Sequence, residues 1–322
     1  MEIDTEAWFA VAAAAHGHDR PSTPAPEHAA EAGRLKVRSP RSRSAVFALP
    51  ATGGYAGVAL LRLFGTTENA KNAKNATTAT TAFLDTFTVH PGRRGRGAGR
   101  ALWDEVRARL AAEGRTSVSA MVQRGGAGEE FALSRGAECA LPMAAYVQEV
   151  REVPAEPVPP PPGYRFLAWT GLVPDEHALA HARAHDAMED APAGDLDLHR
   201  DPWDPERIRA AARLVRDRGG VLLTVAALAE ADGAIAGYTE LVLPTPASVR
   251  AVQYDTVVVP GHRGRGLGRA VKLRMLAYLR AERPGVREIV TTVADANGPM
   301  RAVNAGLGYR ADSAVGMYQL RL

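Results

Sequence analysis

The sequence predicts an α/β protein built from two tandem domains of the same fold, and three observations support this prediction. Two ten-residue segments, Pro91–Arg100 and Pro260–Arg269, differ at only two positions. Each segment follows a run of β-forming residues and precedes an amphipathic helical pattern. Beyond the segments, matching glycines and tyrosines recur at one constant offset, for instance Gly136 with Gly308. A repeat of this length indicates a duplicated domain, because the repeats of solenoids are far shorter.

The first half of the chain opens with helical patterns. Trp8 and Val11 mark one face of a helix over Thr5–His16, and Pro26 is well placed to open a second helix that runs to about Leu35. Strand and helix patterns then alternate. We expect strands at Ser44–Leu49, Tyr55–Phe64, Phe83–Val89 and Ser117–Val122, and a helix from the glycine-rich segment to about Gly114.

The second half contains one more strand than the first. Strands are expected at Tyr164–Trp169, Val221–Leu228, Ile235–Leu243, Val252–Val259 and Glu288–Ala294, with helices at Asp175–Met188, Pro205–Asp217 and after Arg269. Only four residues precede the first helix of the first half, so that half has no counterpart to the Tyr164–Trp169 strand. Its sheet should therefore lack that edge strand or borrow one.

These patterns divide the chain into two domains and a linker. Residues 1–152 are predicted to form the N-terminal domain and residues 164–322 the C-terminal domain. The linker, residues 153–163, holds six prolines and should be a stiff, polyproline-like spacer.

The composition predicts a soluble, cytoplasmic protein. The chain of 322 residues is 46% hydrophobic, which is enough for two ordinary cores. Its single cysteine, Cys139, argues against a disulfide framework or a cysteine metal cluster, and we predict no metal site. Acidic residues (Glu2, Asp4, Glu6) stand where a signal peptide would be basic.

The same composition argues against membranes and nucleic acids as partners. No apolar run approaches the roughly 20 residues that are needed to span a bilayer. The net charge is only +3, and aromatic residues do not interleave the basic clusters as stacking platforms for bases would. A small molecule is the expected partner.

The segment Pro260–Arg269 has the features of an anion-binding loop. It joins a predicted strand to a predicted helix, so backbone N–H groups and the positive end of the helix dipole meet there. It lacks the Gly-Lys-Ser/Thr of a Walker loop and the Gly-x-Gly-x-x-Gly of a Rossmann loop. Its pattern, Arg263-x-x-Gly266-x-Gly268, resembles the pyrophosphate loop of the GNAT acetyltransferase family, which holds coenzyme A. With two copies, the chain resembles tandem GNAT proteins of the mycothiol synthase type.

The resemblance implies a mixed β-sheet in each half, flanked by helices and split into a V that receives the pantetheine arm of acetyl-CoA. The implied cofactor-binding residues of the second half are Thr256, Val257, Val258, Arg263, Gly264, Arg265, Gly266, Leu267, Gly268, Arg269 and Asn297. Those of the first half are Phe87, Thr88, Val89, Arg94, Gly95, Arg96, Gly97, Ala98 and Gly99.

The resemblance also distinguishes the two halves. Asn297 matches the asparagine that contacts pantetheine, whereas Asn304 stands where many members carry the tyrosine that protonates the departing thiolate. An asparagine can donate a hydrogen bond to sulfur but cannot deliver a proton, so the general acid stays open. The first half has Gly125 and Ala132 at these positions. We therefore expect the C-terminal half to catalyse and the N-terminal half to bind coenzyme A at most.

Transfer of an acetyl group to an amine requires a base, because the ammonium must first lose a proton. Asp255, on the strand expected beside the acetyl group, is the first candidate, and Glu240 on the preceding strand is the second. Either carboxylate can instead be solvated or salt-bridged. His185 fits a helix-end cap better than a part of the base relay.

The link between the first two helices of the second half would cap the acceptor site in this family. Asp186, Glu189 and Asp190 lie in it and would attract a cationic amine, although a merely solvated loop is an equal alternative.

The sequence thus predicts an acetyl-CoA-dependent N-acetyltransferase that acts on the primary amine of a small cation, such as an amino sugar, a polyamine, an amine-bearing antibiotic or a pseudodisaccharide. The alternatives are a non-catalytic coenzyme A-binding or scaffold protein and a protein-lysine acetyltransferase. A monomer, which would be an internal pseudo-dimer, and a homodimer are both compatible with the sequence.

Overall fold

The computed structural model describes residues 3–40, 42–65, 80–153, 159–197 and 202–322 and divides into two compact units. Unit 1 comprises Met1–Pro142, Ala193–His199 and Ala314–Leu322, and unit 2 comprises Met143–Pro192 and Arg200–Ser313. The units therefore differ from the sequence halves 1–152 and 164–322. Part of the predicted linker, residues 154–158, lies outside the described residues.

The sheet of unit 1 has the strand order β1-β2-β3-β4-β11. Neighbours are antiparallel except β3 and β4, which run parallel. The strands are β1 (Ser42–Ala51), β2 (Gly54–Phe64), β3 (Thr81–Val89), β4 (Ser117–Gln123) and β11 (Arg310–Arg321).

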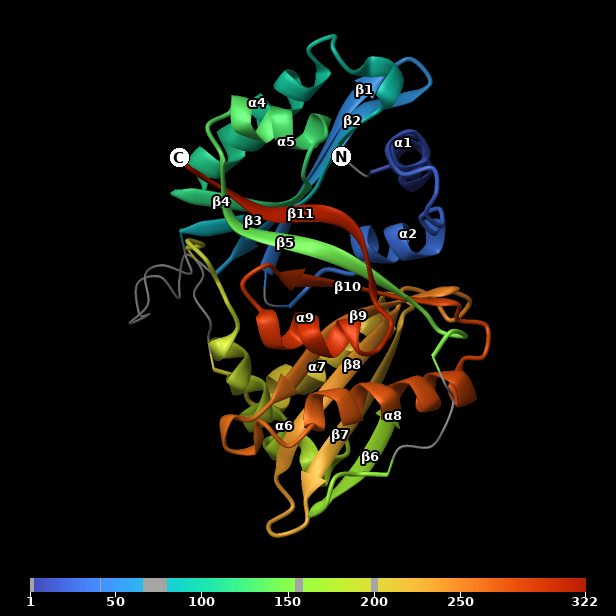
Figure 1. Ribbon diagram of the computed structural model, residues 1–322. Helices are drawn as coiled ribbons and strands as arrows, with labels where there is room; N and C mark the ends of the chain where they lie inside the picture. Colours follow the sequence, from blue (N-terminus) through green and yellow to red (C-terminus); the bar gives the residue numbers. More distant parts are fainter. Residues whose placement is uncertain (1–2, 41, 66–79, 154–158, 198–201) are drawn as a thin grey trace. The chain divides into compact units, whose positions relative to one another are not determined.

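Helices cover both faces of the sheet of unit 1, and the strand β2 is therefore buried on both sides. Val58 and Leu60 pack with Trp8 of α1 (Thr5–Asp19), which is followed by α2 (His28–Lys36). The residues between them, such as Ala59 and Leu61, pack on the opposite face with α4 (Ala98–Ala112). A short helix, α5 (Ala127–Ser134), follows β4 (Figure 1).

The sheet of unit 2 has the order β5-β10-β9-β8-β7-β6. Only β9 and β10 run parallel among its neighbouring pairs in the described chain. The strands are β5 (Glu138–Glu149), β6 (Tyr164–Thr170), β7 (Val221–Ala229), β8 (Ile235–Leu243), β9 (Arg250–Val258) and β10 (Glu288–Ala294).

One face of this sheet carries α8 (Leu267–Glu282) and the other carries α6 (Ala178–His185) and α7 (Pro205–Asp217) (Figure 1). Short 3-10 helices precede and follow α6, namely η3 (Asp175–His177) and η4 (Asp186–Asp190). The helix α9 (Gly298–Ala305) follows β10.

The two sequence halves exchange one strand each. Met143–Glu149 of β5, encoded in the first half, pairs antiparallel with β10 of unit 2. Val315–Arg321 of β11, from the end of the second half, pairs antiparallel with β4 of unit 1. Neither sheet is complete without a strand from the other half of the sequence.

Both sheets are split in the manner that the GNAT resemblance implies. The parallel strands β9 and β10 pair only over their first residues, from Glu288↔Arg250 to Val290↔Val252. The strands β3 and β4 likewise pair only from Thr81↔Ser117 to Phe83↔Ser119. Beyond these pairs each sheet opens into a V, which confirms the predicted fold.

The missing first strand of unit 1 is confirmed as well. In unit 2, β6 pairs with β7 along the edge of the sheet. In unit 1, β1 takes the place of β7, and none of the described residues pairs with its outer edge. No helix in the described ranges is long and apolar enough to cross a membrane.

Candidate active site

The second glycine-rich loop, Pro260–Arg269, turns the chain from β9 into α8. Gly264 and Gly266 have φ angles of 77° and 76°, a left-handed conformation that strains any residue with a Cβ atom. Gly266 is the N-cap of α8. A Cβ atom at either glycine would meet nothing within 4 Å, so the backbone conformation, rather than crowding, selects glycine here.

The first two arginines of this loop make hydrogen bonds to other residues of unit 2. The Arg263 guanidinium donates through Nε to the carbonyl of Val258 (3.0 Å) and through Nη2 to Asp190 (2.6 Å). Arg265 donates to the hydroxyl of Tyr164 on β6 (3.0 Å). All three arginines predicted to bind the cofactor, Arg263, Arg265 and Arg269, are exposed. The loop is thus braced by its own arginines.

The two asparagines after β10 have different surroundings. Asn297 is the N-cap of α9, and its side-chain oxygen accepts a hydrogen bond from the backbone N–H of Met300 (3.2 Å). Asn304 is only 1% exposed, and neither atom of its amide has a partner within the described chain. Leaving a buried amide unpaired costs roughly 1–3 kcal/mol, so each such group in a folded protein requires an explanation.

Glu240 lies at an irregularity of the sheet. The pairing of β8 with β9 shifts between Thr239 and Leu241, so that Tyr254 and Asp255 of β9 oppose Glu240 alone. The Gln253 side chain donates to the Glu240 carbonyl (2.6 Å) and satisfies this backbone group. Bulges of this kind re-aim side chains, and this one brings both predicted carboxylates to one place.

Each carboxylate faces a histidine of α6. Nε2 of His181 lies 3.6 Å from Oε1 of Glu240, and Nε2 of His185 lies 3.4 Å from Oδ2 of Asp255. Thr224 also donates to Glu240 (3.2 Å). The Glu240 side chain is 13% exposed and that of Asp255 is 28% exposed.

Burial sets the protonation of this cluster. It raises the pKa of Glu240 to about 8, and the negative charge of Asp255 adds to the rise. It lowers the pKa of His181 to about 4, so this imidazole is neutral at physiological pH. The pKa of Tyr238, whose buried hydroxyl has no partner among the described residues, is raised by burial and by the charges of Asp255, Glu240 and Asp186.

Aromatic rings enclose these groups. The His181 ring meets Trp169 and Tyr238 edge-on, at centroid distances of 5.6 and 4.6 Å. The His185 ring stacks on Trp203 at 3.8 Å. A site with paired carboxylates, a neutral imidazole and aromatic walls can bind a cationic amine and accept its proton.

The predicted acidic cap contributes unevenly. Asp186 accepts a hydrogen bond from the backbone N–H of Trp203 (3.1 Å), and Asp190 pairs with Arg263. Glu189 is exposed. His185 faces Asp255, which is not the helix-cap role expected from the sequence, because its ring is held between Trp203 and the strand.

The sequence interpretation did not identify His181, Tyr238, Trp169 or Trp203. A signal was present: His181 and His185 are one helical turn apart, and Tyr238 and Glu240 are two residues apart on a strand, so each pair shares a face.

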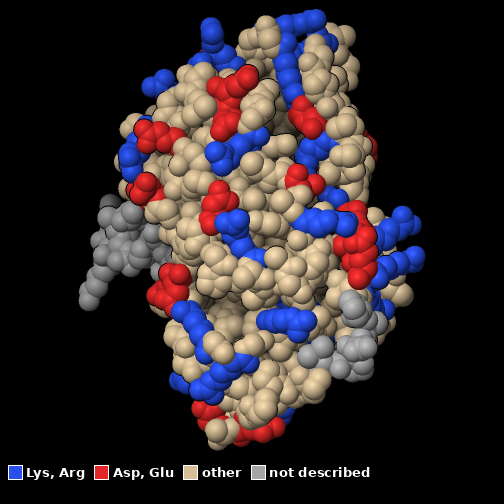
Figure 2. All heavy atoms as spheres, viewed as in Figure 1, with Lys and Arg blue, Asp and Glu red and all other residues tan. Residues whose placement is uncertain are grey.

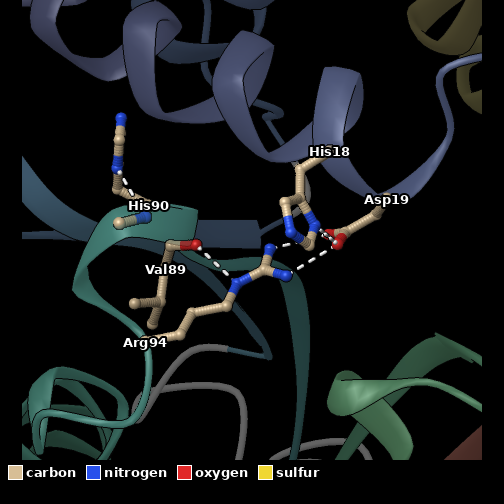
Figure 3. Close-up of polar contacts among 6 residues, drawn as sticks. His18, Asp19, Val89, His90 and Arg94 are labelled. Atoms are coloured by element: carbon tan, nitrogen blue, oxygen red, sulfur yellow. Dashed lines mark hydrogen bonds and ion pairs between the residues drawn. The ribbon is translucent and has the colours of Figure 1, made fainter.

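The first loop, Pro91–Arg100, has the same backbone but other neighbours. Gly95 and Gly97 have φ angles of 70° and 87°. Arg94 donates to the carbonyl of Val89 (3.2 Å) and makes two hydrogen bonds to Asp19 at the end of α1 (2.6 and 2.7 Å), as Figure 3 shows. Arg94 therefore makes the same kinds of contact as Arg263, one with a backbone carbonyl of the preceding strand and one with an aspartate.

Two aromatic rings lie at the opening of the V in unit 1. Phe87 of β3 stacks on Phe131 of α5, with ring centroids 5.3 Å apart. Phe131 also lies against the loop, because a Cβ atom at Gly99 would meet it at 3.3 Å. By the shared register of the strands, Val58, Leu60 and Thr86 stand where unit 2 has Tyr238, Glu240 and Asp255. None of these three positions of unit 1 carries an ionisable side chain.

Comparison with known proteins decides the family. Residues 6–127 and 161–309 each match the model of the acetyltransferase (GNAT) family, and each match contains one loop. The chain belongs to the GNAT acetyltransferase family. It is an N-acetyltransferase with two GNAT repeats, and members of this family use acetyl-CoA.

Individual relatives agree with the tandem plan. Mycothiol acetyltransferase of Salinispora tropica is 30% identical over 243 residues, which cover 72% of this chain and 71% of that protein. A tandem GNAT protein from the clavulanic acid biosynthesis pathway has a TM-score of 0.79 and 28% identity, with 98% of this chain and 94% of that chain covered. A GCN5-related N-acetyltransferase from Sphaerobacter thermophilus, 18% identical with a TM-score of 0.67 over 99% of this chain and 92% of that one, shares the fold.

Proposed function

We propose that unit 2 transfers an acetyl group from acetyl-CoA directly to the primary amine of a small cationic molecule. The observation that carries the proposal is the cluster of Glu240, Asp255, His181 and His185 in unit 2, whose two carboxylates are replaced by Leu60 and Thr86 at the matching strand positions of unit 1. Amino sugars, polyamines, amine-bearing antibiotics and pseudodisaccharide amines are the acceptor classes to test.

The residues of unit 2 fit acetyl-CoA. Backbone groups of Thr256–Val258 border the unpaired part of the V, and the loop from Gly264 to Gly268 leads into the N-terminus of α8. The unpaired amide of buried Asn304 is a group that a ligand atom can satisfy. Acetyl-CoA supplies the thioester, and this chain supplies orientation and proton acceptance.

The proton of the amine would pass to the carboxylate–imidazole cluster. Asp255 is the first candidate because it is the more exposed carboxylate and lies on the strand beside the V. Glu240 is the second, because a base with a pKa of about 8 is well matched to neutral or mildly basic conditions. The acidic Asp186 and the aromatic walls would hold the cation.

Nucleic acid is less well supported as a partner than a small molecule. Acidic and basic side chains are interspersed over the face shown in Figure 2, where nucleic-acid binding would favour a basic patch. A small molecule therefore stays the proposed partner, in a monomer or a homodimer, and we propose a cytoplasmic location.

A panel of amines, with release of coenzyme A as the readout, tests the proposal and names the acceptor class. Acetyl-CoA consumption that no small amine stimulates would contradict it. If a lysine peptide alone stimulates release, the protein-lysine alternative replaces it.

The pH profile separates the two candidate bases. If Glu240 is the base, kcat/KM rises with pH through about 8, because only the deprotonated carboxylate accepts a proton. Glu240→Gln would then remove this rise. An unchanged profile in Glu240→Gln would leave Asp255 as the proposed base.

A further inference from the structure

Unit 1 has a pocket at the sheet edge where unit 2 has the strand β6. In unit 2, β6 covers the edge of β7 from Tyr164↔Ala229 to Thr170↔Leu223. At the corresponding edge of unit 1, β1 has no partner among the described residues, and a pocket of ≈ 380 Å³ opens there. Its lining comes from β1, β2 and the first loop with the start of α4: Leu49, Ala51, Ala56, Arg93, Arg96, Gly97, Ala98 and Ala101.

The repeat shows what fills this space in unit 2. The offset that relates Pro91 to Pro260 places Ala98 and Ala101 opposite Leu267 and Ala270. Leu267 and Ala270 are 1% and 6% exposed, and Leu267 belongs to the same core cluster as Tyr164. Ala101 in contrast is exposed. The pocket of unit 1 is therefore the space that β6, with Tyr164 at its start, occupies in unit 2.

Tyr164 shows which chemistry the space accepts. Its phenol oxygen accepts a hydrogen bond from Arg265 (3.0 Å) and lies 2.9 Å from Nδ1 of His262. Its ring meets the His262 ring edge-on. The space thus holds an aromatic ring whose oxygen faces two nitrogen-bearing side chains of the loop.

The corresponding loop side chains in unit 1 are both arginines. Arg93 replaces His262 and Arg96 replaces Arg265, so a titratable imidazole is exchanged for a permanent positive charge. Neither Arg93 nor Arg96 makes a hydrogen bond or an ion pair with any described residue, whereas Arg94 between them is fully engaged. Two arginines at one rim favour an anion over a phenol.

We propose that this pocket, the vacant-strand pocket, is a binding site for a small aromatic anion, an aryl carboxylate or aryl phosphate. The ring lies on the alanines of the lining, and the anionic group lies between Arg93 and Arg96. No lining residue belongs to β3 or β4, which form the V, although Arg96, Gly97 and Ala98 also belong to the first glycine-rich loop. The proposal does not depend on which acceptor the active site uses.

A peptide strand fits this edge less well than a small molecule. Pro50 stands between the lining residues Leu49 and Ala51, and a proline has no N–H to donate to an added strand. Farther along β1, Arg43 is held in an ion pair with Glu113. Proline and charge at a sheet edge are features that oppose strand addition.

The test uses the full chain and phenyl phosphate as the probe, with binding followed by calorimetry and ligand-observed NMR. Arg93→Ala and Arg96→Ala should each weaken binding by on the order of tenfold, because each removes a charge-assisted hydrogen bond. Ala101→Phe should remove binding by filling the pocket without changing charge, and exposed Ala101 tolerates a larger side chain in the folded protein. Arg100→Ala, which removes an exposed loop arginine outside the lining, is the matched control and should bind as the wild type does. Benzoate in place of phenyl phosphate tells whether the carboxylate or the phosphate is preferred.

Three results would overturn the proposal. Inorganic phosphate that binds as tightly as phenyl phosphate would show an anion site without the aromatic component. Loss of probe binding in Gly266→Val, with full binding in Ala101→Phe, would place the probe in unit 2. Tighter binding of a peptide that copies residues 163–169 would show that the edge receives a strand instead.

Discussion

The two glycine-rich loops are nearly identical in sequence, yet each meets a different environment. Both turn through left-handed glycines and both use one arginine to hold a preceding carboxylate: Arg94 holds Asp19 in unit 1, and Arg263 holds Asp190 in unit 2. In unit 2 the adjacent V is bordered by ionisable groups, whereas in unit 1 it is bordered by Phe87 and Phe131. The loop alone therefore does not distinguish the two units; the side chains on the neighbouring strands and helices do.

The largest expected effect comes from the same substitution in both loops. Gly266→Val should reduce turnover to background, because valine at a φ of 76° strains the turn that precedes α8. Gly97→Val imposes the same strain at a φ of 87° in unit 1 and should leave turnover largely intact. Steady-state kinetics measure the difference, and circular dichroism of both variants controls for folding. Equal loss of turnover in two folded variants would end the functional distinction between the units.

A smaller loss of activity is expected from a substitution in β9, the strand that borders the V of unit 2. Asp255→Asn keeps the shape of the side chain but removes its negative charge, and it should lower kcat/KM by on the order of 10²-fold, as loss of a general base does. Coenzyme A affinity, measured by calorimetry, should be unchanged. The matched change in unit 1, Thr86→Val, should have no kinetic effect, because no ionisable group is removed. Wild-type rates in both Asp255→Asn and Glu240→Gln would exclude the two carboxylates as bases.

Much of this comparison could be predicted from the sequence, because the duplicated loop fixes a strand, a turn and a helix at two places at once. The missing first strand followed from the few residues before α1, and Asp255 and Glu240 stood out as acids in apolar strands. The exchange of β5 and β11 could not be predicted, since the same strand patterns allow pairing with either sheet. The role of His181 depends on a contact between α6 and β8 that no local pattern encodes.

The rings of Phe87 and Phe131 allow a test of why the two units should differ in coenzyme A affinity. We propose that the first loop binds coenzyme A more weakly than the second, because Phe131 packs against Gly99 and Phe87 where the V opens. In a Gly266→Val background, which leaves only unit 1 intact, Phe131→Ala should strengthen coenzyme A binding by roughly tenfold as the ring no longer has to move. Phe131→Leu, which keeps an apolar side chain of intermediate size, should fall between. Titration calorimetry that shows no gain in Phe131→Ala would mean that the ring pair does not limit access.

The smallest expected effect concerns the ion pairs that hold the two loops. Arg94 and Asp19 form two parallel hydrogen bonds, whereas Arg263 and Asp190 form one and are both about half exposed. Double-mutant cycles on the free energy of unfolding should therefore give a coupling of roughly 0.5–1 kcal/mol for the first pair and less for the second, with both weakened by salt. The hydrogen bond from Arg94 lowers the pKa of Asp19, although burial opposes the shift. A lowered carboxyl pKa stabilises the folded state fully above the unfolded value of about 4, and this contribution is lost as the pH falls through the lower folded-state pKa. The coupling of the first pair should therefore disappear in acid. A coupling that is equal for both pairs, or that persists in acid, would contradict this difference between the loops.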